Sequence, residues 1–238
     1  MNYPPITFKI GKTQVLHLLF FAFLAFLVSG CSSTRLHIDE QALAELRMKE
    51  PLLLFPPLTS NSKLGRISED LGKCYNVEVP KRVNGTVIYS NNIDTLNHAQ
   101  SWSNLIKNGA VNTMEAAAIG KSVGCSSVLT CQIMTINQYP PFRMVVNLLW
   151  IDADTGTIIG RLYQDIDLSD SETNYRFSNF VGHGPAKEIY VKLWYSQDLY
   201  QTAYLMPQEF FRFTAAYTTR MLFGEVSSIP WWYFWRIF

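Results

Sequence analysis

Residues 127–168, SVLTCQIMTINQYPPFRMVVNLLWIDADTGTIIGRLYQDIDL, hold three apolar segments separated by turn-forming residues. The segments 127–137, 142–151 and 158–168 have the length of strands and are rich in β-branched and aromatic residues. A short turn over residues 152–157 joins the last two, and its Gly156 suits a positive φ. Three consecutive strands at this spacing predict an antiparallel meander.

The segments on either side of the meander predict helices and further strands. Residues 113–124 (TMEAAAIGKSVG) indicate a helix of small residues that ends at Gly124. Residues 207–223 indicate another, with Pro207 at its start and Gly224 after it. Residues 51–57 and 86–90 are typical of strands and 62–76 of a helix, whereas residues 169–188 are polar and show no clear pattern. The prediction is one α/β domain over residues 51–224, three-layer-like, with helices packed on a mixed sheet that includes the meander.

A secretory signal precedes the domain. Lys9 and Lys12 form its positive region, residues 15–28 are almost wholly apolar, and Val28-Ser29-Gly30-Cys31 has the form of a bacterial lipobox. A transmembrane helix needs about 20 apolar residues, more than this run supplies. The sequence therefore predicts a cleaved signal peptide over residues 1–30, with Cys31 as the lipid-bearing first residue of the mature protein. Residues 31–50 are then a lipidated tether that leads to a short helix.

This reading places the protein in the bacterial cell envelope, anchored by lipid chains such as palmitate. Two or three acyl chains hold a protein firmly on a membrane, at about 0.8 kcal/mol per buried CH₂. Ser32, rather than Asp, follows the lipidated cysteine and favours the periplasmic face of the outer membrane. The mature chain would carry 18 lysines and arginines against 19 acidic residues, so no basic surface indicates nucleic acid.

The remaining cysteines are Cys74, Cys125 and Cys131, an odd number that leaves at least one thiol unpaired or bonded to another molecule. If residues 125–131 are extended, their two cysteines are too far apart to bridge, so a disulfide would involve Cys74 with either of them. No Cys-x-x-Cys motif or zinc-like spacing occurs, and neither a metal nor a cofactor is expected.

The order of elements resembles the periplasmic α/β domain of the curli-secretion lipoprotein superfamily. That superfamily includes the curli channel subunit, lipoprotein activators of penicillin-binding proteins and the amino-terminal domain of the Tol-system propeller protein. The similarity covers roughly residues 51–223 and is most specific over residues 124–129 and 152–156. The resemblance implies this fold and the binding of other proteins at the envelope. Residues 91–112 and 169–206 lack the alternation that membrane strands of a channel need.

Two motifs were weighed as catalytic sites. Asp154-Thr155-Gly156 matches the aspartic-protease triplet, but that chemistry needs a second carboxylate to share the proton, and the chain has one copy. A hairpin turn explains it better. Gly182-His183-Gly184 has no serine or cysteine motif beside it, so a flexible surface loop explains His183 better. The sequence therefore predicts no catalytic residue and no enzymatic activity.

Residues 225–238 form a predicted aromatic tail. Tryptophan and tyrosine favour the headgroup layer of membranes, and their amphipathic rings are also common in protein interfaces. Contact with a membrane or a partner is therefore favoured over packing into the core. The residues expected to make it are Trp231, Trp232, Tyr233, Phe234, Trp235 and Phe238.

Together these features predict a membrane-anchored envelope lipoprotein that acts as a non-enzymatic protein-binding or assembly module. It would contact the membrane through the lipid on Cys31, bind an envelope protein partner, and could self-associate. The alternative is a subunit of an outer-membrane secretion channel or another oligomeric envelope complex. A ring of identical subunits in detergent extracts would favour the channel.

Overall fold

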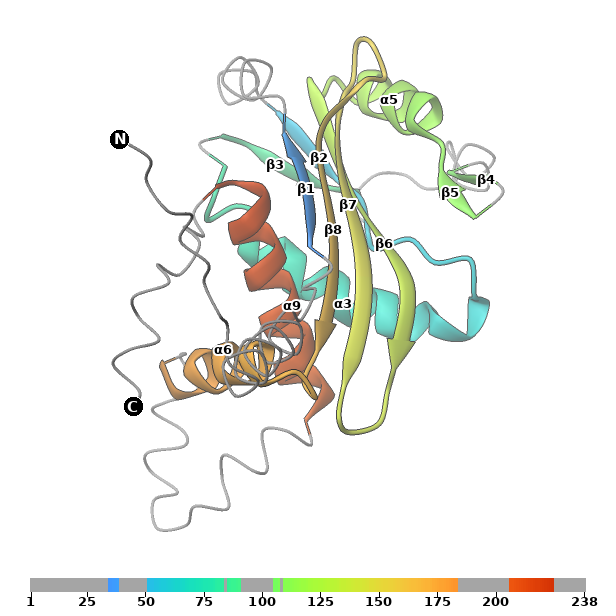
Figure 1. Cartoon of the computed structure of the whole chain (residues 1–238). Helices are drawn as coiled ribbons and strands as arrows, with labels where there is room; N and C mark the ends of the chain where they lie inside the picture. The colour runs from blue at the N-terminus through green and yellow to red at the C-terminus, as the bar shows by residue number, and fades with distance from the viewer. Residues whose placement is uncertain are drawn as a thin grey trace, which may run out of the picture. The chain divides into compact units, whose positions relative to one another are not determined.

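A computed structural model describes residues 34–38, 51–83, 85–90, 105–107, 109–183 and 206–224. A six-stranded mixed sheet is its centre, with strand order β1-β8-β7-β6-β2-β3 (Figure 1). The strands are β1 (Arg35–Ile38), β2 (Leu52–Leu54), β3 (Val87–Tyr89), β6 (Ser127–Asn137), β7 (Arg143–Asp152) and β8 (Ile158–Asp167). The short strands β4 (Ile106–Lys107) and β5 (Ala110–Val111) form a separate two-stranded pair. The helices are the 3₁₀ turn η1 (Ser62–Leu64), α3 (Gly65–Glu78), α5 (Thr113–Ser122), α6 (Ser171–His183) and α9 (Pro207–Leu222).

The predicted meander is confirmed. Strands β6, β7 and β8 are antiparallel neighbours, with Ser127 opposite Asp152 on one side and Met144 opposite Ile166 on the other. Strand β2 is parallel to both β6 and β3, whereas β1 runs antiparallel to β8 at the opposite edge. The sheet is therefore mixed, as the α/β prediction required.

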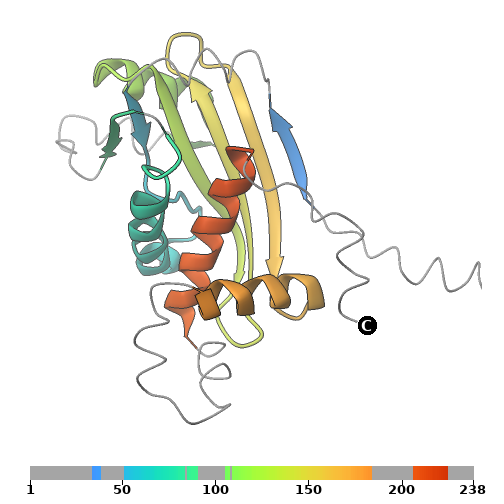
Figure 2. The ribbon, with the colours of Figure 1, turned by 90° about the vertical axis from the view of Figure 1, so that its left-hand side faces the viewer.

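Helices α3, α6 and α9 lie on one face of the sheet, which we call the inner face (Figure 2). Helix α9 begins with a proline, whose missing backbone N–H would have no partner in the first turn of a helix. The helix buries the aromatic residues Phe210 and Phe213. Phe177 of α6 meets Phe213 edge to face, at 5.4 Å between ring centroids. Each such side chain contributes about 1.5–3 kcal/mol by leaving water, so these contacts fix the inner layer.

Helix α5 packs on the opposite, outer face of the sheet. It begins where the side chain of Asn112 accepts a hydrogen bond from the Glu115 amide, and its last turn leads to Gly124 at φ +80°. Gly120 lies against the side chain of Val128, where an added Cβ would collide. The small residues predicted for this helix therefore allow close approach to the sheet, which completes the three layers.

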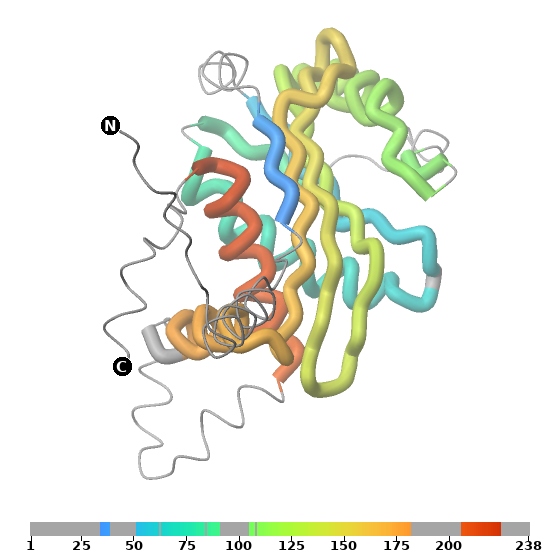
Figure 3. Tube along the Cα trace, in the orientation of Figure 1, coloured from blue at the N-terminus to red at the C-terminus, as the bar shows by residue number. Residues whose placement is uncertain are grey.

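The structure differs from the sequence expectations at two segments. Arg35–Ile38, within the predicted tether, form a strand at the sheet edge beside β8 (Figure 3). Ser171–His183, for which the sequence showed no clear pattern, form helix α6, so the interpretation of His183 as part of a surface loop was wrong. The reason is capping and burial: an Asp170 side-chain oxygen accepts a hydrogen bond from the Thr173 amide at 2.9 Å, and Phe177 is fully buried. The predicted short helix before residue 50 lies outside the described residues.

Candidate functional site

The residues predicted to contact membrane or partner lie outside the part of the chain that the structure describes. These are Cys31 and the aromatic residues Trp231, Trp232, Tyr233, Phe234, Trp235 and Phe238. Their roles stay predictions. The structure does describe Thr34 and Gly224, the described residues nearest in sequence to Cys31 and to the aromatic residues.

Thr34 is held against the sheet at the start of β1. Its hydroxyl donates to the side-chain carbonyl of the buried Gln164 at 2.7 Å. The Gln164 side-chain amide in turn donates to the Asp165 carbonyl at 2.8 Å. Arg35, the next residue, lies opposite Tyr163 in the ladder. Strand β1 is therefore joined to the sheet by side-chain as well as backbone hydrogen bonds.

The end of α9 lies near the other end of the same strand. Leu222 is fully buried, and the ring of Phe223 lies 5.0 Å from that of Trp150. A Cβ added at Gly160 would lie 3.4 Å from the side chain of Leu222, and Gly160 is the ladder partner of Ile38. Thr34 and the last turn of α9 therefore both lie at the β1 edge of the sheet.

The Asp154-Thr155-Gly156 motif forms the tight turn between β7 and β8, as predicted. A side-chain oxygen of Asp152 accepts the amides of Asp154 and Thr155 at 2.7 and 3.2 Å, and Gly156 has φ +70°. Asp154 itself is exposed, 3.4 Å from the ammonium of Lys121. Among the described residues, no group of three or more His, Cys, Asp or Glu side chains could hold a metal ion. This arrangement shapes a turn and supplies no paired carboxylates.

Substitutions in this turn should distinguish the contributions of Asp152 and Asp154 to stability. Asp154→Asn should change the free energy of unfolding by less than about 0.5 kcal/mol, because an exposed ion pair contributes little. Asp152→Ala should cost about 1 kcal/mol, since two backbone donors lose their acceptor. Urea unfolding of both variants measures the difference. Proteolysis at acid pH that disappears in Asp154→Asn would contradict the structural role.

The three described cysteines are free thiols, so the disulfide that the sequence left open does not form. Cys125 packs with the outer-face core beside α5, whereas Cys131 belongs to the inner-face core, which puts the sheet between them. Burial raises the pKa of the Cys74 thiol to about 11 and that of Cys131 to about 12. Both thiols are therefore protonated at neutral pH and react slowly.

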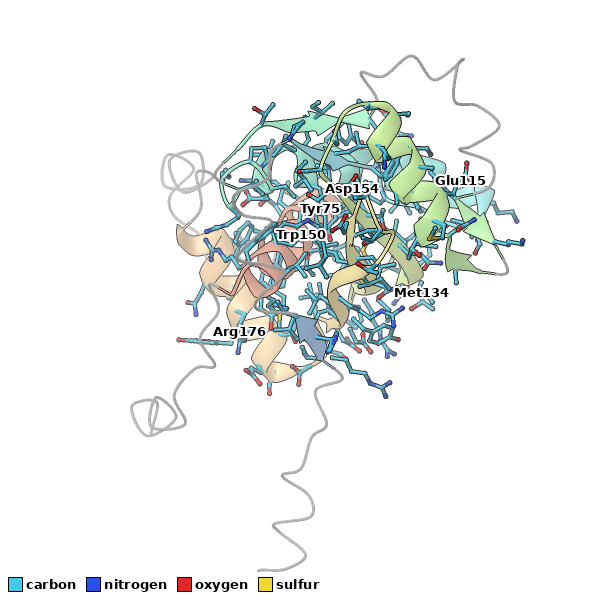
Figure 4. The ribbon with its side chains drawn as sticks, turned by 90° about the horizontal axis from the view of Figure 1, so that it is seen from above. Tyr75, Glu115, Met134, Trp150, Asp154 and Arg176 are labelled. Atoms are coloured by element: carbon cyan, nitrogen blue, oxygen red, sulfur yellow. The ribbon has the colours of Figure 1, made fainter. Side chains whose placement is uncertain are left out.

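The sequence analysis missed a buried polar cluster between α3, α9 and β6. The hydroxyl oxygens of Tyr75 and Thr218 lie 2.9 Å apart, and the Cys131 thiol donates to Tyr75 at 3.5 Å. Burial raises the pKa of Tyr75 well above its usual value, so the phenol stays neutral. Figure 4 places Tyr75 and Trp150 among the interior side chains, whereas Glu115 and Arg176 lie toward the outside. With every group neutral and enclosed, this cluster holds two helices to the sheet.

The loop between β6 and β7 displays large apolar side chains on an ordered base. Tyr139 is 78 % exposed at the tip, and Met134 of β6 is 45 % exposed. At the base, the buried ring of Phe142 stacks on Phe210 of α9 at 5.5 Å. The Asn137 side chain accepts the Tyr139 amide at 3.3 Å. The tip therefore presents an aromatic ring at low conformational cost, as protein-binding surfaces often do.

No helix among the described residues has both the length and the apolar character needed to cross a membrane. In sequence, neither a protein-family model nor a curated protein matches the chain.

Several solved structures are similar in fold, and three are described here. PelC, a dodecamer from Paraburkholderia phytofirmans, is 8 % identical, with 58 % of this chain and 81 % of that chain covered and a TM-score of 0.39. Lipoprotein GNA1162 from Neisseria meningitidis is 11 % identical, with 56 % and 97 % covered and a TM-score of 0.35. The C-terminal domain of LpoB from Salmonella enterica is 12 % identical, with 53 % and 93 % covered and a TM-score of 0.33. Similarity at this distance says nothing of activity or partners.

Proposed function

We propose that this chain is a lipid-anchored protein of the bacterial envelope that acts without catalysis, as a binding or assembly module. The observation that carries the proposal is the lipobox ending at Cys31, three positions before the domain begins at Thr34. A signal peptide followed directly by a folded domain is suited to displaying that domain at a membrane. The periplasmic face of the outer membrane is the proposed location, because Ser32 follows the cysteine.

The tip of the β6–β7 hairpin is the proposed protein-binding surface. Large exposed apolar side chains on a rigid support are typical of residues that dominate binding energy. Tyr139 fits this description, because its loop is held by the Asn137 hydrogen bonds and by the Phe142–Phe210 stack. The salt bridge between Arg143 and Asp165, at 2.6 Å, further joins the hairpin to β8. A partner would therefore bind a surface that is already ordered.

Capture of envelope proteins by the acylated chain tests this function. Immobilised wild-type protein should retain a partner from detergent-solubilised envelopes, and Tyr139→Ala should reduce that retention by about tenfold, the effect of losing 1.4 kcal/mol. Val77→Ala is the matched control, because Val77 is an exposed apolar residue on helix α3. Equal retention by both variants and the wild type would contradict the proposed surface. A closed ring of identical chains without a partner would favour the channel instead.

A further inference from the structure

We propose that the edge of the sheet formed by β1 lies against a phospholipid membrane, with Arg35 and Arg161 on lipid phosphates. This inference deepens the proposed function and rests on it, because it takes Cys31 as the point of anchoring. It names the face of the domain that the anchor turns toward the lipid. Three features carry it: the length of chain beside the anchor, the position of the other end of the domain, and the charge along the edge.

The chain between the anchor and the fold is short. Three residue steps separate Cys31 from Thr34. Even when fully extended, they span at most about 11 Å. Thr34 is bonded to the buried Gln164, and Arg35 is already in the ladder with β8. A lipid on Cys31 would therefore hold this strand close to the headgroups.

The end of helix α9 lies at the same edge. Helix α9 contacts β8 and β1, and its buried Leu222 lies beside Gly160, the partner of Ile38. The aromatic residues 230–238 follow Gly224 after five intervening positions. An anchor at one end of β1 and interfacial aromatics from beside its other end both direct this edge to the bilayer. Helix α3 lies on the far side of α9 from β1 (Figure 2).

Among the described residues, the edge carries two exposed arginines, Arg35 and Arg161, that no acidic side chain pairs with. His37 lies directly opposite Arg161, and Arg35 lies opposite Tyr163, so these four side chains share the outer face of the two strands. Arg35, His37 and Arg161 are exposed, and no ion pair involves either arginine within the described residues. The acids farther along β8, Asp165 and Asp167, pair with Arg143 at 2.6 and 3.6 Å. The planar guanidinium group of arginine can donate two parallel hydrogen bonds to the oxygens of a phosphate.

The short segment between Cys31 and Thr34 favours a lipid surface over a protein as the partner of this edge. A folded domain of about 100 residues has a radius of gyration near 13 Å. A span of about 11 Å between the anchor and Thr34 leaves no room for such a domain between strand and headgroups. The occupant that fits this gap is the phospholipid surface.

Site-specific fluorescence on the full acylated chain tests the orientation. A bimane label at His37→Cys reports on the β1 edge, and one at Val77→Cys, an exposed position of α3, is the control. The native thiols are poor competitors for the label, because burial raises the pKa of Cys74, Cys125 and Cys131. The proteins are reconstituted on vesicles of phosphatidylethanolamine and phosphatidylglycerol that carry a headgroup nitroxide quencher. Flotation first establishes that each protein is bound to the vesicles.

We expect the label at position 37 to lose most of its emission and the label at position 77 to keep it. Adding Arg35→Glu and Arg161→Glu should weaken this quenching at position 37, because carboxylates are repelled by lipid phosphates. Equal quenching at both positions on floated protein would overturn the orientation while leaving the anchor intact. Quenching unaffected by the two arginine substitutions would overturn the phosphate contact. A chain that does not float would overturn the anchor and this inference with it. If the label at position 37 is shielded from the quencher only after envelope proteins are added, the edge is a protein interface and not a lipid contact.

Discussion

Cys31→Ala is expected to abolish lipid attachment completely and leave the precursor uncleaved. The thiol of Cys31 is the group that would accept the diacylglycerol, and alanine offers no nucleophile in its place. Cells grown with labelled palmitate should therefore show a labelled wild-type band and an unlabelled variant band that is larger by residues 1–30. Mass spectrometry of the N-terminal peptide measures both the acylation and the cleavage.

Cys74→Ala is the matched control, because it also removes one thiol but lies in α3 with its side chain partly buried. It should keep the palmitate label and the cleavage. Wild-type protein that retains residues 1–30 and carries no fatty acid would refute the lipoprotein assignment. Label in Cys31→Ala would place the lipid on another residue.

Trp150→Ala is expected to cost about 3–5 kcal/mol of the free energy of unfolding, the range for truncating a large buried aromatic. Trp150 is 2 % exposed and lies on the inner face of β7. Its ring meets Phe223, and it packs over Gly160, whose missing side chain makes room for it. Alanine would leave a cavity under the last turn of α9. Far-UV circular dichroism during urea unfolding measures the loss without depending on tryptophan emission.

Tyr139→Ala serves as the control for that measurement, because it removes an aromatic ring from an exposed position. Its effect on stability should stay within about 0.5 kcal/mol, as for most surface substitutions. A Trp150→Ala cost below about 1 kcal/mol would contradict the packing between β7 and α9. The comparison also separates stability from binding, since Tyr139 is proposed to act only in the latter.

The strands of the meander could be predicted because their signals are local. Residues 143–152 and 158–167 are apolar enough to be buried, and the turn between them is built by Asp152 and Gly156 themselves. The helix ending at Gly124 and the helix starting at Pro207 have local start and stop signals of the same kind. None of these strands and helices needs a residue distant in the sequence for its prediction.

Helix α6 and strand β1 could not be predicted, because distant residues stabilise them. Helix α6 is largely polar, and its buried Phe177 packs against Phe213, which lies in another helix. Strand β1 has four residues, too few for a clear alternation, and forms by pairing with β8, as the Thr34–Gln164 bond across 130 positions shows. The same holds for Tyr75 and Thr218, whose hydroxyl groups come into contact only when α3 packs against α9.

The sequence by itself determined the lipobox and its cysteine, the α/β class and the tight turn over residues 152–157, because each depends on neighbouring residues. Only the tertiary structure decided that Cys125 and Cys131 lie on opposite faces of the sheet and remain free. It also decided that Thr34 and the last turn of α9 lie at one edge of the sheet, beside Arg35 and Arg161. The physical reason is that a sheet edge is defined by which strands pair, and β1 meets β8 and α9 only after the chain has folded back on itself.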